Sequence, residues 1–401
     1  MRSERGRRGS RDRIAISLIF AVHGTVAGTY AARLPWIADH VHATPGVLGA
    51  AMITPTIGAL LGMPLTGHLV HRFGGRSALR LLMLLWTASL AIPALMPDIG
   101  WLAAGLFVYG ANAGVADVMM NAEAVRIEKR AGKSIMSALH GMWSVGGIVA
   151  GLFGALCAGA GISAVPEFLV TALILTVAAF LATGLLPADA ELGAAAAEEI
   201  RPPRFALPTG KLLGIGIVGF CAVFAEGAGS NWSAVYLTSV THASAAIGAY
   251  CVTGFAATMA LGRLSGDAIV RRLGPVWTVR VGGTLAVLGA VAVVAARSPW
   301  LGIVGFAALG LGIATGVPLA IAATGRTDQD ADSAVAGITS VMYASGLLAG
   351  PSIGALGSAV SLPFAFGFVA VLSTGIGLSA YTLRVGLDGA TNQLADVRSP
   401  A

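Results

Sequence analysis

Long apolar segments alternate with short polar segments along most of the chain. Each apolar segment reaches the length of about 20 residues that a helix needs to cross the hydrocarbon core of a bilayer. The pattern therefore predicts an all-α membrane protein with twelve transmembrane helices. They are expected at residues 14–38, 47–70, 78–97, 99–126, 136–160, 165–187, 212–240, 246–268, 277–297, 300–324, 335–360 and 362–384.

The longest polar stretch, residues 188–211, divides the twelve helices into two groups of six. The basic segment before the first helix is expected to be a disordered tail. The predicted parts are a basic cytoplasmic tail at 1–13, a six-helix bundle at 14–187, a cytoplasmic linker at 188–211, a second six-helix bundle at 212–384 and a cytoplasmic tail at 385–401.

Basic residues gather in alternate loops, and this places the loops relative to the membrane. Loops rich in Lys and Arg stay on the cytoplasmic side. Both ends of the chain fall on that side, as twelve crossings require, which is typical of a bacterial inner-membrane protein. A nucleic-acid site would instead gather the net charge of +6 on one surface. The main basic loops carry Arg72, Arg76 and Arg80; Arg126, Lys129, Arg130 and Lys133; Arg201, Arg204 and Lys211; Arg271, Arg272 and Arg280; and Arg326.

The chain also resembles itself at an offset of 200 residues. A constant offset through separate segments, arginines included, indicates two related halves. Transporters are often built in this way, with the solute held between the halves near the middle of the membrane. The repeated residues are Gly62, Arg72, Gly74 and Arg80 with Gly262, Arg272, Gly274 and Arg280; Gly105, Gly110 and Arg126 with Gly305, Gly310 and Arg326; and Met142, Gly146 and Gly154 with Met342, Gly346 and Gly354.

Composition agrees with a membrane protein and offers no enzyme chemistry. The chain is 56% hydrophobic and 11% charged, against about 25% charged residues in soluble domains. Its 55 glycines suit close packing of membrane helices. Cys157, Cys221 and Cys251 have no metal-ligand spacing and are expected to be packing residues. No P-loop, CxxC, HExxH or GxSxG pattern occurs, so we expect no enzyme, no cofactor and no metal.

The loop after the second predicted helix reads G-H-L-V-H-R-F-G-G-R, from Gly67 to Arg76. It resembles the loop motif of the major facilitator superfamily, with His71 at the motif's acidic position. The resemblance implies the major facilitator fold and a gating role for this loop and its counterpart, whose arginines would pair with acids at helix ends. The matching residues are Gly67, Arg72, Gly74 and Arg76 in the first half and Asp267, Arg271, Arg272 and Gly274 in the second.

Further segments are similar to a subgroup of bacterial permeases distantly related to the fucose permeases. Asn231 stands where that subgroup leads us to expect Asp. The resemblance implies a central cavity lined by the first and seventh helices. The segments are A-A-R-L-P-W-I (31–37), D-V-M-M-N-A (117–122), L-H-G-M-W-S-V-G (139–146), E-G-A-G-S-N-W-S-A-V-Y-L (226–237) and G-P-S-I-G (350–354).

Ionisable residues within apolar segments are candidates for the site, because each costs at least about 2.5–3.5 kcal/mol at bilayer depth. Asp117 lies about 13 Å before Arg126 along the fourth helix. Asn121 follows on the same face. Removal from water favours the neutral carboxyl, as a proton carrier needs; a structural hydrogen bond is the alternative. Asn112 can bind solute or bridge helices, and Glu123 is expected to form a structural or gating ion pair with Arg126.

The seventh helix carries a second candidate group. Glu226 lies about 21 Å beyond Leu212, past the midplane, and is expected to face a cavity. Asn231 and Trp232 can contact solute or form an outer gate, although Trp232 can also belong to an interfacial aromatic belt. Arg33 can snorkel to headgroups, pair with Glu226 or bind an anionic solute.

The fifth and eleventh helices complete the predicted cavity. His140 can exchange protons near neutral pH or serve only in packing. Trp143 can stack on a sugar ring or close a gate, and Tyr343 occupies the related place in the second half. Pro351 is expected to make the eleventh helix a hinge.

We therefore predict a secondary active transporter that moves a small solute across the inner membrane by alternating access. Proton-coupled symport of a sugar-like or other small polar compound is the first hypothesis. Proton-driven efflux of small organic compounds is the alternative within this class. A membrane receptor that binds solute without moving it is the alternative from another class. The expected partners are the solute, the proton and the lipid bilayer, with no nucleic acid and a monomeric chain.

Overall fold

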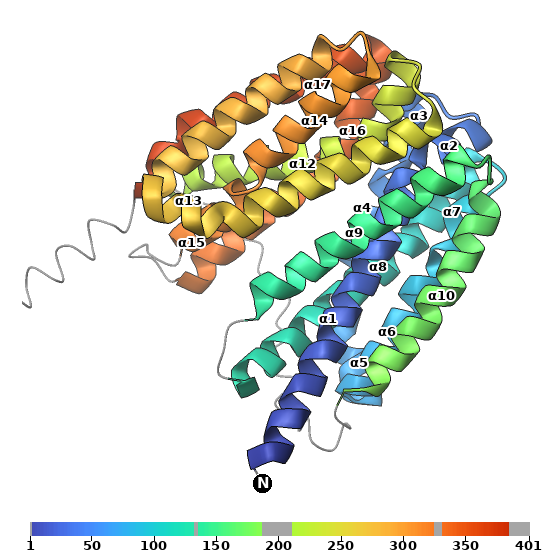
Figure 1. Cartoon of the computed structure of the whole chain (residues 1–401), viewed down its shortest axis with the longest axis vertical. Helices are drawn as coiled ribbons and strands as arrows, with labels where there is room; N and C mark the ends of the chain where they lie inside the picture. The colour runs from blue at the N-terminus through green and yellow to red at the C-terminus, as the bar shows by residue number, and fades with distance from the viewer. Residues whose placement is uncertain (1, 132–134, 187–210, 325–330, 385–401) are drawn as a thin grey trace, which may run out of the picture. The chain divides into compact units, whose positions relative to one another are not determined.

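The computed structural model of the chain describes residues 2–131, 135–186, 211–324 and 331–384, and every regular element in these ranges is a helix (Figure 1). The first half contains α1 (Arg2–Ala32), α2 (Leu34–His40), α3 (Pro45–Ala51), α4 (Ile53–Gly62), α5 (Leu65–Phe73), α6 (Gly75–Ser89), α7 (Ala91–Leu95), α8 (Ile99–Ala131), α9 (Met136–Gly159) and α10 (Ala164–Gly184). The second half contains α12 (Lys211–Val240), α13 (Ala245–Val294), α14 (Pro299–Ile313), α15 (Gly316–Thr324), α16 (Ala331–Ala359), α17 (Leu362–Ser379) and the short 3₁₀ helix η2 (Ala380–Arg384).

The predicted fold class is confirmed. Within the described ranges, eleven helical segments are long and apolar enough to cross a membrane. The remaining predicted segment, 335–360, coincides with helix α16, where many Ser and Gly residues and Pro351 lower the apolar content. Short breaks divide some predicted helices, as between α4 and α5.

The N-terminal region differs from the expectation of a disordered tail. Helix α1 begins at Arg2 and runs without a break into the first apolar segment, whose membrane-length part is Ser10–Ala32. The tail and the first transmembrane helix thus form one helix. The predicted linker, except for Lys211, and the predicted C-terminal tail lie outside the described residues.

The chain divides into two compact units. The first unit comprises Met1–Pro202 and Ala234–Thr253, and the second comprises Pro203–Ser233 and Gly254–Ala401. The segment Ala234–Thr253 thus groups with the first unit, where Ala249 joins Ala32 and Ala155 in a buried cluster.

Glycines let helices of the first unit approach at backbone distance. Helix α1 packs along α9, and α4 packs along α8 (Figure 1). A Cβ atom at Gly24 would overlap the Trp143 carbonyl group, and one at Gly110 would overlap the backbone of Pro55. Helices α13 and α14 of the second unit also pack closely at glycines, where Gly282 faces Gly312. This packing fits membrane helices, which associate through small residues.

Gly110→Ala is expected to destabilise the protein by about 1–3 kcal/mol, because the added methyl group has no space beside Pro55. The matched control is Gly67→Ala in helix α5, since nothing lies within 4 Å of a Cβ atom there. Thermal unfolding of both variants in detergent measures the difference. Equal unfolding temperatures would show that α4 and α8 do not pack as closely as described.

The backbone repeats the 200-residue offset found in the sequence. Gly74 has φ 80° and ψ 162°, and Gly274 has φ 75° and ψ 163°. This region strongly favours glycine, so both halves use Gly to turn the chain at the same place. His42 and His242 are likewise the two non-glycine residues with positive φ in the described ranges, at 51° and 54°.

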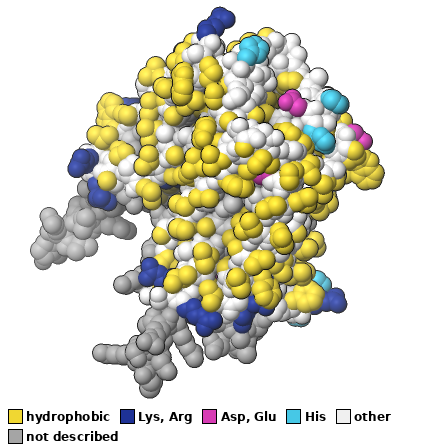
Figure 2. Space-filling model, turned by 45° about the vertical axis from the view of Figure 1, so that its right-hand side comes forward, with side chains coloured by type: hydrophobic (Ala, Val, Ile, Leu, Met, Phe, Trp, Pro, Cys, Tyr) yellow, Lys and Arg dark blue, Asp and Glu magenta, His cyan; other side chains and the backbone are white. Residues whose placement is uncertain are grey.

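Large apolar side chains cover much of the surface. Leu173, Val371 and Leu378 are among those exposed. Hydrophobic side chains dominate the face shown in Figure 2, and Lys and Arg side chains lie at its margins. A surface of this kind requires a lipid environment, because water-soluble monomers rarely expose large contiguous apolar patches.

Candidate functional site

A buried histidine is surrounded by polar and aromatic side chains of the first unit. His23 lies in helix α1, inside the membrane-length segment Ser10–Ala32, and is 7% exposed. The indole Nε1 of Trp143, on α9, donates a hydrogen bond of 3.1 Å to its Nδ1. Its Nε2 has no hydrogen-bond partner among the described residues. The Trp143 hydrogen bond therefore holds the ring in one orientation.

Three further aromatic side chains form a row of neighbouring rings that begins at His23. The Trp86 ring lies 5.0 Å from the His23 ring and 4.6 Å from Tyr109, and Tyr109 lies 5.3 Å from Tyr30, all between centroids. These three side chains are buried. The Tyr30 hydroxyl and the Trp86 indole nitrogen have no hydrogen-bond partner in the described part of the chain. Both polar atoms thus lie inside the first unit, beside His23 and Tyr109.

Asp117 and Asn121 of helix α8 lie next to this group. The Asn121 amide donates to the Asp117 carbonyl oxygen at 2.9 Å and to its carboxylate Oδ1 at 3.2 Å. The Asp117 carboxylate is close enough to His23 to act on its charge, and the backbone of Ala113 also lies near the ring. The first unit thus places an acid within electrostatic range of an imidazole at membrane depth.

Glu226 forms an ion pair in the second unit. Both of its carboxylate oxygens accept hydrogen bonds from one Arg263 nitrogen, at 3.0 and 2.9 Å. The two side chains are 28% and 29% exposed, so the pair is only partly buried. Glu226 lies on α12 and Arg263 on α13, so the pair joins the seventh and eighth predicted helices.

The two residues predicted beside Glu226 are differently placed. The Asn231 amide donates to the Gly227 carbonyl oxygen of its own helix, at 3.1 Å. Trp232 is completely buried, and its indole nitrogen has no partner among the described residues. An interfacial belt position is therefore excluded for Trp232, because belt residues are exposed at the headgroup level.

Arg33 pairs with Glu167, so the predicted pairing with Glu226 is replaced by a different one. Arg33 Nε lies 3.1 Å from Glu167 Oε2, with the side chains 3% and 0% exposed. Arg33 also donates to the Ile162 carbonyl oxygen. Snorkelling is excluded by this burial. The buried Cys157 thiol lies against the same carboxylate, so this cysteine packs beside a charge and not only among apolar groups.

The remaining cavity candidates are at least partly accessible. His140 is exposed, with its ring edge-on to Phe20 at 5.5 Å. Tyr343 is exposed on α16. Asn112 is partly buried, and no hydrogen bond of its amide occurs within the described ranges.

Several predicted gating residues form contacts within the first unit. Glu123 pairs with Arg126 at 3.0 Å and with Arg130 at 3.3 Å, so the predicted pair is present in an extended form. Arg76 donates to the carbonyl oxygens of Thr183 and Gly184 at the end of α10, at 3.2 and 2.8 Å.

Three exposed arginines lie in the two predicted gating loops. Arg72 lies over the Phe73 ring at 5.5 Å. Arg271 and Arg272 are also exposed, and none of the three has a carboxylate partner in the described part of the chain. The Asp267 side chain lies outside the described residues.

Besides the aromatic residues Tyr30, Trp86 and Tyr109, four charged or histidine residues were not singled out from the sequence: His23, Glu128, Glu167 and Arg263. His23 met the criterion applied to the others, an ionisable residue within an apolar segment. Glu167 and Arg263 lie near predicted helix ends, where charges are common. Glu128 accepts hydrogen bonds from the backbone nitrogens of Ile135 and Met136, so it ties the end of α8 to the start of α9. A search of the described residues finds no His, Cys, Asp and Glu group that could hold a metal ion.

Sequence comparisons place the chain among membrane transporters. The family profile described as Major Facilitator Superfamily matches residues 16–351. An uncharacterized MFS-type transporter of Yersinia pestis is 35% identical over 376 residues, covering 93% of this chain and 96% of the relative. An uncharacterized transporter of Sinorhizobium fredii is 30% identical, with 91% and 96% covered. The membrane protein MosC of Rhizobium meliloti is 29% identical, with 88% and 86% covered.

Solved structures share the fold at low sequence identity. The nucleoside transporter NupG has a TM-score of 0.74 at 13% identity, covering 93% of this chain and 98% of that one. A bacterial homologue of the human lysosomal transporter Spinster has a TM-score of 0.72 at 14% identity, with 95% and 98% covered. The E. coli fucose:proton symporter FucP has a TM-score of 0.56 at 18% identity, with 92% and 98% covered. At such identities the likeness shows the fold alone.

Proposed function

Because this chain belongs to the major facilitator superfamily of membrane transporters, we propose that it moves a small polar solute together with protons. The observation that carries the proposal is the group around His23, in which Asp117 and a hydrogen-bonded imidazole lie together within membrane-length helices. Charged groups at this depth usually mark solute or proton pathways.

Proton uptake at this group would reduce the cost of a charge at bilayer depth. When Asp117 is protonated, the carboxyl is neutral and can donate as well as accept hydrogen bonds. A conformation that removes Asp117 from water is then favoured over one that hydrates it. Proton binding moves the equilibrium between such conformations only through this difference in affinity. His23, held by Trp143, would pass the proton to or from the carboxylate.

The Glu226–Arg263 pair is the proposed polar contact for the solute in the second unit. Both Glu226 oxygens already accept hydrogen bonds from Arg263, whereas Asp117 Oδ1 accepts one from the neutral Asn121 amide, so we assign the proton to Asp117 and not to Glu226. The pair's partial exposure leaves donor and acceptor capacity for hydroxyl groups of a solute. Asn112 and Tyr343, with partly or largely accessible side chains, would add contacts of the same kind.

Aromatic and hydroxyl groups near His23 favour a sugar-like solute. The rings of Trp86 and Tyr30 present apolar faces, and their N–H and O–H groups, which have no partner among the described residues, are possible hydrogen-bond donors. Two proteins of this fold, a nucleoside transporter and a fucose:proton symporter, are named for solutes that contain sugar rings.

The proposed setting is the bacterial inner membrane, with a monomeric chain and both termini in the cytoplasm. The concentration of arginines in alternate loops supports this orientation. Arg72, Arg271 and Arg272 are exposed, as cytoplasmic loop residues would be.

The test is uptake into liposomes that contain the purified protein and have an alkaline interior. A panel of labelled sugars, nucleosides, amino acids and aromatic acids is added outside. We expect at least one sugar-like solute to accumulate above equilibrium and to leave when a protonophore is added. Accumulation only with the opposite gradient would establish efflux. Solute-dependent thermal stabilisation without any counterflow would establish a receptor, and either result would overturn symport.

A further inference from the structure

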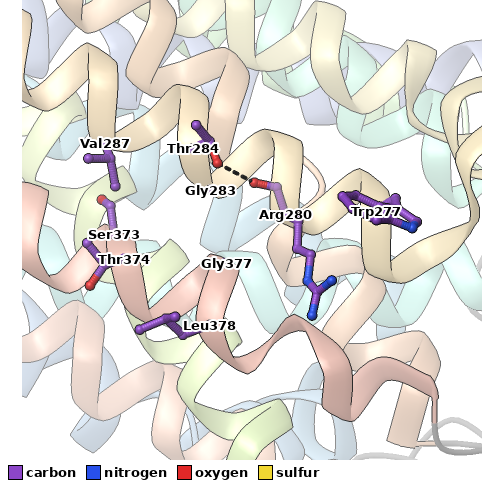
Figure 3. Close-up of a pocket in the computed structure, with 9 residues that line it drawn as sticks. All are labelled: Trp277, Arg280, Gly283, Thr284, Val287, Ser373, Thr374, Gly377 and Leu378. Carbon is purple, nitrogen blue, oxygen red and sulfur yellow. Dashed lines mark hydrogen bonds between the residues drawn. The ribbon is translucent and has the colours of Figure 1, made fainter.

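A groove lies on the second unit between the latter part of α13 and helix α17 (Figure 3). Its volume is about 780 Å³. Trp277, Arg280, Thr284 and Val287 line it from α13, and Ser373 and Leu378 are among the residues that line it from α17. The groove is separate from the Glu226–Arg263 pair, since none of its lining residues belongs to that group.

One end of the groove is cationic and aromatic. The Arg280 guanidinium extends toward α17 in Figure 3, and it lies 5.3 Å from the centre of the Trp277 ring. Trp277 is 58% exposed. Within the described residues, no carboxylate pairs with Arg280 and no hydrogen-bond partner of its guanidinium is found. Arg280 lies six residues beyond the Gly274 turn, about 9 Å along the helix, at the end of the bundle that carries Arg271 and Arg272.

Arg80, the residue related to Arg280 by the 200-residue offset, makes different contacts. Arg80 lies 4.7 Å from the Phe180 ring, and its Nε donates to the Thr183 hydroxyl at 3.2 Å. Arg80 thus has a protein partner of its own. Arg280 also lies against an aromatic ring, but its guanidinium has no hydrogen-bond partner among the described residues.

The rest of the groove is apolar and opens toward the surface that lipid covers. Val287 and the exposed Leu378 form its walls. Gly283 and Gly377 lie at backbone distance from each other and leave the floor without side chains. Ser373 is buried, and its hydroxyl has no partner in the described part of the chain. The groove therefore continues from a cationic end into a smooth apolar channel with one further available hydroxyl.

We propose that this groove binds one anionic phospholipid. Its phosphate would accept hydrogen bonds from Arg280, beside Trp277 at the headgroup level, and an acyl chain would lie over Gly283 toward Val287 and Leu378. Basic pockets between transmembrane helices bind anionic headgroups, and Trp side chains favour the same depth. A soluble anion would satisfy Arg280 but would leave the apolar part of the groove empty.

Native mass spectrometry of the full-length protein with phosphatidylglycerol tests the assignment, with phosphatidylcholine as the neutral lipid. We expect one retained phosphatidylglycerol whose apparent affinity falls about fivefold in Arg280→Gln, since one arginine near the surface contributes roughly that factor. Arg280→Lys should retain most of the affinity. Arg80→Gln is the matched control, because that arginine already has a protein partner, and it should retain the lipid.

A second variant covers the case in which Arg280→Gln does not fold. Thr284→Glu adds a negative charge to the groove wall without removing Arg280, and it should expel the lipid. Unchanged lipid retention in Arg280→Gln or Thr284→Glu would overturn the proposal. Thermal stabilisation by inorganic phosphate equal to that by phosphatidylglycerol would also overturn it, because the site would then select the phosphate group alone.

Discussion

Proton-driven uptake is expected to fall at least about tenfold in Asp117→Asn, while counterflow of the same solute stays near the wild-type rate. A carboxylate at bilayer depth costs at least about 2.5 kcal/mol, and a protonation step that removes this cost can shift a conformational equilibrium by more than tenfold. Asparagine is nearly the same size but binds no proton. The variant should therefore exchange solute across the membrane without using the pH gradient. Initial rates in liposomes, with and without a pH gradient, measure both quantities.

Asp39→Asn is the matched control for this experiment, because Asp39 is an exposed acid in the short helix α2. Its uptake should equal that of the wild type. His23→Gln should also slow proton-driven uptake, since it removes the imidazole but keeps a hydrogen-bond acceptor near Trp143. Full proton-driven uptake in Asp117→Asn would assign the coupling to another group.

Glu167→Ala is expected to destabilise the protein by about 3–5 kcal/mol, because it leaves the buried Arg33 charge without its partner. Arg33 is almost completely buried, so water cannot replace the carboxylate. The measurement is the unfolding free energy in detergent, or the thermal midpoint where unfolding is irreversible. Asp39→Asn again provides an exposed-acid control.

The double variant Arg33→Met with Glu167→Leu distinguishes a structural pair from a solute site. Replacement of a buried ion pair by apolar residues of similar size is often neutral or stabilising. We expect the double variant to recover most of the stability lost in Glu167→Ala and to retain solute binding. Wild-type stability of Glu167→Ala together with lost solute binding would instead place Arg33 in the solute site.

The helices could be predicted from the sequence because each apolar segment has the length that a helix needs to cross a bilayer. Eleven of the twelve predicted segments reach membrane length and apolarity in the described residues. Gly74 and Gly274 were paired by the repeat, and in the structure both adopt a backbone conformation that favours glycine. Segment length and glycine positions can be read from the sequence without knowledge of tertiary contacts.

The partners of the buried charges could not be predicted, because they depend on how neighbouring helices are rotated about their axes. Helices that are apolar on nearly all sides give little periodic signal for that rotation. Arg33 therefore remained compatible with several partners until the structure placed Glu167 beside it. Arg263, near a predicted helix end, had no sequence feature that linked it to Glu226, 37 positions earlier.

The most direct test of proton coupling through Asp117 is to measure the proton movement that solute entry causes. A pH-sensitive dye is trapped in liposomes that contain the protein, with equal pH on both sides, and a transported solute is added outside. We expect acidification of the interior with the wild type and none with Asp117→Asn. Solute entry without acidification in the wild type, or equal acidification in Asp117→Asn, would contradict it.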